Sequence, residues 1–61
     1  MSVHYQVEAD FGKGKNWQRN FQKHASFETA EAMGKLFQKL AKVRIVEITE
    51  THEEVIIPLE Q

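Results

Sequence analysis

Apolar and polar side chains alternate without interruption in the run Val3-His4-Tyr5-Gln6-Val7-Glu8-Ala9-Asp10-Phe11. A period of two residues is typical of a β-strand with one buried face, because successive side chains of a strand point to opposite faces of the sheet. The odd-numbered side chains are therefore expected to face the interior. This segment is the clearest strand of the chain, and the other elements are placed relative to it.

A reversal of the chain is predicted directly after this strand, at residues 12–16, where Gly12 and Gly14 permit a positive φ. The return segment, residues 17–25, alternates less regularly. One of its faces carries Trp17, Arg19, Phe21, Lys23 and Ala25. Cations mixed with apolar residues are typical of a strand at the edge of a sheet, where charge discourages pairing with other chains. The two segments together predict a β-hairpin.

Beyond residue 26 the apolar period changes to that of a helix. The i, i+3, i+4, i+7 spacing is carried by Ala30, Met33, Leu36, Phe37 and Leu40. We expect an amphipathic helix from about Thr29 to Lys42, with Thr29 as its N-cap and Ser26 as the alternative. Gly34 inside this helix costs on the order of 1 kcal/mol relative to Ala, which a close approach to the sheet would explain.

Two segments rich in β-branched residues, 43–50 and 54–59, follow the helix and predict a second hairpin. In the first of these strands we assign Val46 and Ile48 to the core. The outer face is then left with Ile45, Ile56 and Pro58. Pro58 lacks a backbone N–H, which tends to confine it to an edge strand or to the end of a strand.

The predicted fold class is α+β, with one helix packed on one face of a four-stranded, mainly antiparallel sheet in the order β-β-α-β-β, as a single domain over residues 1–61. A chain this short buries only about 60% of the surface that it exposes when unfolded. The absence of Cys excludes disulfides and thiolate zinc sites, which leaves oligomerisation as a means of stabilisation. No membrane span or signal peptide is recognised, so we expect a cytoplasmic protein without a membrane partner.

Charge is divided unevenly along the chain, although the net charge is only -1. The segment from Gly12 to Arg44 holds all 8 Lys and Arg residues and, of the acids, only Glu28 and Glu31. The segment from Ile45 to Gln61 holds several Glu residues and no base. A cationic half beside an anionic half favours association with a partner or with a second copy.

Nucleic-acid binding is one interpretation of the first hairpin. It combines cations with aromatic side chains in Lys13, Lys15, Trp17, Arg19, Phe21 and Lys23. Such a combination suits a groove that follows a phosphate backbone and stacks bases. The other interpretation is that Trp17 and Phe21 belong to the core and that the cations keep an edge strand soluble. The acidic second hairpin opposes the approach of a polyanion, so nucleic-acid binding stands as the alternative to protein binding.

Catalytic residues, cofactors and bound metals are not predicted. His4, His24 and His52 lack the spacing of a metal motif, and Gly12-Lys13-Gly14-Lys15 lacks the spacing of a phosphate-binding Walker loop. We therefore expect a non-enzymatic protein that recognises another protein. Its interface is predicted at Ile45, Ile56 and Pro58, whose apolar side chains a small fold would profit from covering, with a homodimer as one arrangement.

Three parts of the chain together resemble many short proteins of bacteriophages and prophages. These parts are Trp17, the run Ser26-Phe27-Glu28-Thr29-Ala30-Glu31-Ala32, and the run Val43-Arg44-Ile45-Val46-Glu47-Ile48-Thr49-Glu50. Members of that loose group tend to have two strands, a helix that opens with Phe-x-Thr or Phe-x-Ser, and a hairpin rich in Val, Ile and Glu. The resemblance implies an accessory protein that binds a host or phage protein, and it assigns no residue a role.

Overall fold

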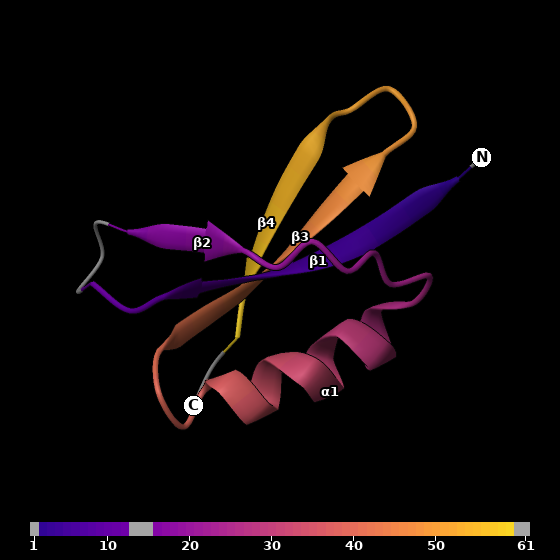
Figure 1. Ribbon diagram of the computed structural model, residues 1–61. Helices are drawn as coiled ribbons and strands as arrows, with labels where there is room; N and C mark the ends of the chain where they lie inside the picture. The colour runs from indigo at the N-terminus through magenta and orange to yellow at the C-terminus, as the bar shows by residue number, and fades with distance from the viewer. Residues whose placement is uncertain (1, 13–15, 60–61) are drawn as a thin grey trace.

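The computed structural model describes residues 2–12 and 16–59, in which there are one helix and four strands. In chain order the elements are β1 (Val3–Asp10), β2 (Trp17–Arg19), α1 (Phe27–Phe37), β3 (Lys42–Thr49) and β4 (Glu54–Pro58). All neighbouring strands are antiparallel, and the sheet has the order β2-β1-β3-β4. Helix α1 packs on one face of the sheet, against β1 and β3 (Figure 1). The predicted α+β architecture is confirmed.

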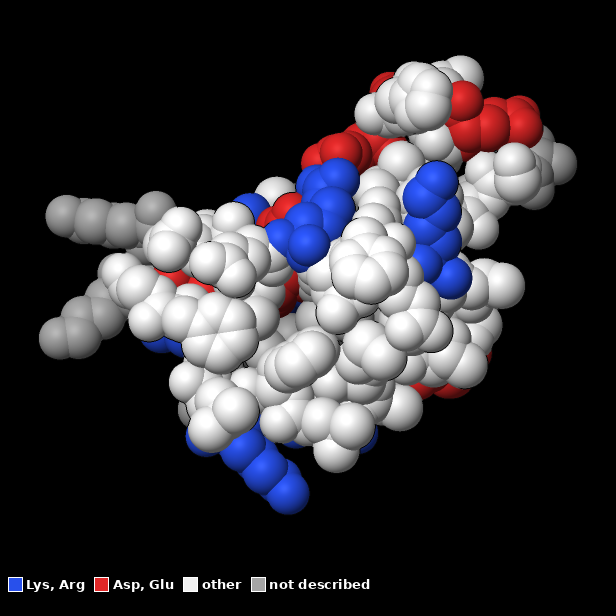
Figure 2. Space-filling view, viewed as in Figure 1, with Lys and Arg blue, Asp and Glu red and all other residues white. Residues whose placement is uncertain are grey.

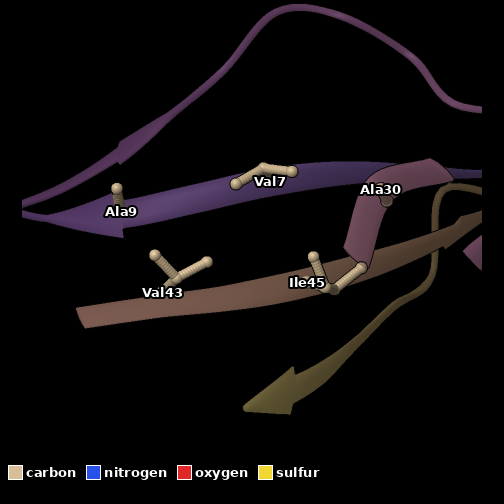
Figure 3. Packing of buried hydrophobic residues seen from close by; sticks show 5 residues of the cluster. All are labelled: Val7, Ala9, Ala30, Val43 and Ile45. Carbon is tan, nitrogen blue, oxygen red and sulfur yellow. The ribbon is translucent and has the colours of Figure 1, made fainter. Parts of the chain in front are cut away.

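The main core lies between α1 and the two central strands. Val7 pairs with Ile45 and Ala9 pairs with Val43, so these four side chains share the face under the helix. Figure 3 shows them together with Ala30 of α1, and all five are buried in one cluster. The prediction that odd-numbered side chains of the first strand face the interior is therefore confirmed for Val7 and Ala9.

The outer face of the sheet, which is the face turned away from α1, does not carry Ile45. That side chain is fully buried under the helix, so its assignment to an exposed interface was wrong. Val46 and Ile48 are buried as expected, but on the outer face, where Gln6 and His4 of β1 pair with them. Because β3 is a central strand buried on both faces, its apolar pattern does not tell which face the helix covers.

Helix α1 begins and ends earlier than predicted. Its N-cap is Ser26, the alternative to Thr29, and the Ser26 hydroxyl accepts a hydrogen bond from the Thr29 N–H at 3.3 Å. The helix ends at Phe37, and a turn connects it to β3. Leu36 and Leu40 of the predicted apolar stripe are exposed and not buried, which corrects that part of the expected core.

Small residues set the position of α1 over the sheet. Ala30 and Gly34 are its buried residues. A Cβ atom at Gly34 would lie 2.7 Å from Leu59 Cδ1 and 3.1 Å from Val43 Cγ1, so there is no room for a side chain there. The helix thus turns a line of small residues toward the sheet, and the larger leucines beside that line stay in solvent.

Strand β2 is much shorter than the predicted strand of residues 17–25. Arg19 pairs with Glu8, and a regular ladder would bring residue 22 opposite Tyr5. His24 stands there instead, joined to Tyr5 by two backbone hydrogen bonds of 2.8 Å. The two additional residues form a bulge at residues 20–23. This bulge re-aims the side chains that a continuous strand would have placed on the sheet.

Candidate functional site

Two arginines and two glutamates cross the outer face of the sheet, and we term these four residues the clasp. Glu8 of β1 accepts hydrogen bonds from Arg19 Nε at 2.8 Å and from Arg44 Nε at 2.7 Å. Arg19 also donates to both carboxylate oxygens of Glu54, at 2.8 and 3.1 Å. Arg19 and Glu54 lie on opposite edge strands, which in a flat sheet are three spacings of about 4.8 Å apart. The contact therefore requires the strongly twisted sheet that Figure 1 shows.

The clasp balances its own charge. Glu8 is its buried member, and two guanidinium groups compensate its carboxylate, which is what a buried charge requires. The hydrogen bonds to Glu54, and then those to Glu8, raise the pKa of the Arg19 guanidinium above its ordinary range, while burial opposes the shift. The hydrogen bond from Arg19 in turn lowers the pKa of the Glu54 carboxyl. The clasp is thus a structural element that leaves little positive charge for a phosphate.

The single tryptophan belongs to the same arrangement. Trp17 pairs with Asp10 and is half-buried on the outer face, so it does not lie in the core under the helix. The guanidinium carbon of Arg44 lies 4.0 Å from the centroid of the Trp17 ring, which is a cation–π contact. One face of the indole is therefore already covered.

The predicted nucleic-acid surface comprised Lys13, Lys15, Trp17, Arg19, Phe21 and Lys23. Lys13 and Lys15 lie outside the described residues. Trp17 and Arg19 are engaged in or against the clasp, and Phe21 and Lys23 are exposed beyond it. The structure does not gather the described members of this set into one cationic, aromatic surface.

A different feature stands out on the side of the helix, where a hollow of about 230 Å³ opens between the β1–β2 hairpin and α1. We term it the aromatic groove. Its apolar lining consists of Val7, Ala9, Phe11, Phe21 and Phe37. Val7 and Ala9 form its floor, because they belong to the sheet face that the helix covers only in part. Phe21 is 91% exposed and Phe11 54%, so both rims stand in solvent.

Two exposed leucines lie near Phe37 in the chain, one at the end of α1 and one in the turn that follows it. Leu36 is 66% exposed and Leu40 is 77% exposed. With 3.6 residues per turn, Leu36 lies on the side of Phe37 that is opposite to Gln38, whereas Leu40 belongs to the turn that follows the helix. Gln38 donates to the Leu59 carbonyl at 3.4 Å, so its side of the helix faces the C-terminal segment and Leu36 points away from that segment. The sequence prediction assigned both leucines to the core and therefore missed this exposed apolar surface.

In the part of the chain that the structure describes, exposed lysines without a salt bridge occur in the segments next to the groove, whereas many of the acids lie on the β3–β4 hairpin. Lys23, Lys35 and Lys39 are exposed, and no salt bridge of the described residues involves a lysine. Figure 2 shows uncharged surface in the middle of the face, blue Lys and Arg side chains around it, and red acids over the β3–β4 hairpin at the upper right. The division of charge seen along the sequence is thus preserved on the molecular surface.

The residues predicted for a protein interface fall in two places. Ile45 is in the core, as described above. Ile56 and Pro58 lie on β4, the edge strand opposite to β2, and both are exposed. The neighbouring Val55 is exposed as well, and the predicted interface did not include it.

Groups that carry chemistry are dispersed over the described residues. No cluster of three or more His, Cys, Asp or Glu side chains that could hold a metal ion occurs in residues 2–12 and 16–59. His24 is buried with no partner at Nε2, and the Asp10 carboxylate accepts the N–H groups of Gly12 and Asn16, which fixes the chain as it leaves β1. Within the same ranges there is no helix with the length and apolar character needed to cross a bilayer.

No protein-family model, curated protein or solved structure matches the chain.

Proposed function

We propose that this protein is a non-enzymatic interaction module that holds an acidic, apolar segment of another protein in the aromatic groove. The observation that supports the proposal most directly is that the exposed side chains of Phe11 and Phe21 line one hollow together with Phe37. Contiguous apolar surface in solvent, rimmed by polar residues, is typical of binding sites. The resemblance to short phage and prophage proteins agrees with such a role, and we extend the proposal to an accessory protein of that kind.

The groove offers anchoring positions on both of its banks. Phe21 projects from the bulge and Phe37 lines the hollow from α1, with the exposed Leu36 next to Phe37 in the chain, so we place a bound segment between the bulge and the end of α1. Full burial of one such side chain contributes about 1.5–3 kcal/mol, and a few well-packed anchors commonly supply most of the energy of an interface. Two anchors alone correspond to weak binding, so the affinity depends on further contacts along the groove and at its charged surroundings.

The exposed lysines near the groove favour a partner segment that carries carboxylates. Lys23 follows Phe21 closely in the chain, Lys35 precedes Leu36 in α1, and Lys39 precedes Leu40 in the turn after the helix. These lysines have no salt-bridge partner within the described residues, so carboxylates of a bound segment are the groups that complement them. Complementary charge at the rim of an interface increases the association rate and excludes basic competitors.

Nucleic acid fits the described surface less well than an acidic protein segment does. Both arginines of the outer face are compensated by Glu8 and Glu54, and Arg44 covers one face of the Trp17 ring. Base stacking on that face and phosphate binding by those arginines would require the clasp to open. The exposed Phe21 and Lys23 alone provide a small surface for a polyanion.

A displayed library of random peptides tests the proposal with a defined probe. The enriched peptides should combine aromatic or aliphatic residues with Asp and Glu. Their dissociation constants, measured with purified protein, should rise by about tenfold or more in Phe21→Ser and in Leu36→Ser, because each change removes an anchor. The matched control is Val55→Ser, which removes a similarly exposed apolar side chain from β4 and should leave the affinity unchanged.

Three outcomes contradict the proposal: no enrichment, enrichment of basic peptides, or unchanged binding in both groove variants. A parallel titration with single-stranded oligonucleotides at low salt separates the two classes of partner. Trp17 is the only tryptophan, so its fluorescence reports directly on the outer face. A saturable change on adding oligonucleotide, together with no peptide enrichment, would favour the nucleic-acid alternative.

A further inference from the structure

Within residues 2–12 and 16–59, no strand pairs with the outward side of the β4 backbone. Leu59 N–H donates to the Val43 carbonyl at 3.2 Å, and Thr49 N–H donates to the Glu53 carbonyl at 3.0 Å. Hydrogen-bonded positions alternate along an antiparallel pair, so residues 53, 55, 57 and 59 direct their backbone groups toward β3. The positions between them direct their backbone groups to the open edge, and these are Glu54, Ile56 and Pro58.

The two edges of the sheet are protected to different degrees. Strand β2 is only 3 residues long, carries the charged Arg19 and is followed by a bulge. All three features discourage the addition of another strand. On β4 the strand is 5 residues long, and Val55 and Ile56 are 52% and 47% exposed at its centre. Protective residues occur only at its ends, as Glu54 and Pro58. The middle of β4 is therefore a free, apolar edge.

We infer that this edge pairs with the same edge of a second copy of the chain, antiparallel and around a two-fold axis at Ile56. In that register the Ile56 N–H of each copy donates to the Ile56 carbonyl of the other, and the Glu54 N–H donates to the other copy's Pro58 carbonyl. Pro58 has no N–H to leave unpaired. Every outward N–H of the edge therefore finds an acceptor, and the two sheets become one.

The side chains fit the same register. Ile56 meets Ile56 on the outer face, and on the other face the exposed Val55 meets the second copy's Ile57, so apolar groups pair with apolar groups. Glu54 stands opposite Pro58, which keeps the carboxylates of the two copies from facing each other. A shift by two residues would place Ile56 beside Glu54 and is less favourable.

A second copy is the preferred partner because two β4 edges complement each other. Their backbone hydrogen bonds match, apolar side chains meet apolar side chains, and the Glu54 carboxylates do not face each other. A chain of 61 residues without Cys also has few other means of adding stability. The aromatic groove lies toward β2, at the opposite edge of the sheet, so the dimer leaves both grooves open. Such a dimer presents two groove sites to its partner.

Sedimentation measurements over a range of concentrations up to about 1 mM, the weak end of specific association, test the pairing. The mass should rise toward that of two chains. Ile56→Lys should weaken the dimer by at least about tenfold, because two ammonium groups then meet at the axis. The control Phe21→Lys introduces the same charge at the groove and should leave the dimer unchanged. A single-chain mass at every concentration, or an equal effect of both variants, would overturn the inference.

Single cysteines report the register, since the natural chain has no thiol. Residues of a hydrogen-bonded antiparallel pair have Cα atoms about 5.5 Å apart, which is within the range of a disulfide. Ile56→Cys should therefore form an intermolecular disulfide under mild oxidation. Val55→Cys should do so far more slowly, because its copies are diagonal to each other. Equal rates for the two variants, or faster reaction of Val55→Cys, would contradict pairing around Ile56.

Discussion

At the scale of single residues, the distance between helix and sheet depends on the missing side chain at Gly34. Glycine inside a helix costs about 1 kcal/mol relative to alanine. Here that cost is offset because Val43 and Leu59 occupy the space in which a Cβ would lie. The close approach also lets Ala30 reach complete burial against the sheet. Gly34 thus lowers the intrinsic stability of the helix but allows α1 to pack closely on the sheet.

Gly34→Ala is expected to lower the free energy of unfolding by about 1 kcal/mol. Overpacking of a core costs roughly 1–3 kcal/mol, from which the helical gain of about 1 kcal/mol is subtracted. The end of Leu59, at 2.7 Å, can rotate away, but the β-branched Val43, at 3.1 Å, is held in one rotamer by its strand. Urea denaturation followed by Trp17 fluorescence measures the change.

Two comparisons separate packing from helical propensity in that experiment. Ala32→Gly, on the exposed side of α1, reports propensity alone and should cost about 1 kcal/mol. In a background of Leu59→Ala, the closest contact is gone, and Gly34→Ala should become less destabilising. If Gly34→Ala raised stability by the full helical gain, the packing account of this glycine would be wrong.

The alternation in β1 predicted which of its apolar residues lie under the helix, but not that Gln6, Glu8 and Asp10 on the other face are buried as well, and it was wrong for the exposed Phe11. In β1 the alternation identified Val7 and Ala9 correctly. In β3 both faces carry apolar residues, with Val43 and Ile45 on one and Val46 and Ile48 on the other. A period of two then gives equal support to both assignments, and only the position of the helix decides between them. This is why Ile45 was misplaced.

At the scale of elements, the clasp joins two edge strands that the sequence alone does not bring together. Arg19 was expected to protect an edge, but its partner is Glu54, 35 positions later in the chain. Their contact depends on strand order and twist, neither of which is encoded in local periodicity. The bulge at residues 20–23 could not be predicted from the sequence either, because the alternation of side chains continues through it. The existence of the hairpin was predictable, and its exact length was not.

The clasp makes stability depend on pH in the acidic range. Hydrogen bonds from Arg19 lower the pKa of the Glu54 carboxyl below its usual 4.5, so the folded protein takes up a proton there less readily than the unfolded chain does. The resulting stabilisation is complete above about pH 4.5 and is lost as the pH falls through the lower pKa of the folded state. Glu54→Gln should therefore flatten the decrease in the unfolding midpoint below about pH 4.5, as measured by thermal denaturation.

A matched carboxylate provides the control for this titration. Glu31 of α1 has no salt bridge within the described residues, so Glu31→Gln should leave the acid dependence as steep as in the natural protein. The natural protein and Glu54→Gln should differ most at the most acidic pH at which both still fold. Parallel curves for these two proteins over the whole range would show that the pair does not stabilise the fold.

At the scale of the whole molecule, the fold class followed from the change between a period of two and a period of 3.6 residues along the chain. The aromatic groove did not, because Phe11, Phe21 and Phe37 meet only once β2 lies beside β1 and the bulge has turned Phe21 outward. The helix also carries a small-residue line next to its leucine line, and either line can face a sheet. The division of charge was visible in the sequence and persists on the surface (Figure 2).

The order in which amide hydrogens exchange tests this description of the molecule as one cooperative unit. β1 and β3 pair along 8 residues each and border the main core. Opening them is equivalent to unfolding the chain, which at 0.05–0.15 kcal/mol per residue requires roughly 3–9 kcal/mol. Their amides should therefore exchange at the free energy of global unfolding, determined independently by urea denaturation at the same low concentration.

The outward amides of Glu54 and Ile56 provide the contrast within the same experiment. In dilute solution they face solvent and should exchange with little protection, whereas at high concentration pairing of two β4 edges should slow them. The β1 and β3 amides should show no separate, easier opening at either concentration. If the amides of β3 exchanged well below the free energy of global unfolding, its two buried faces would open independently of the core. The outer face and its clasp would then have to be treated as a separate, weaker unit of the structure.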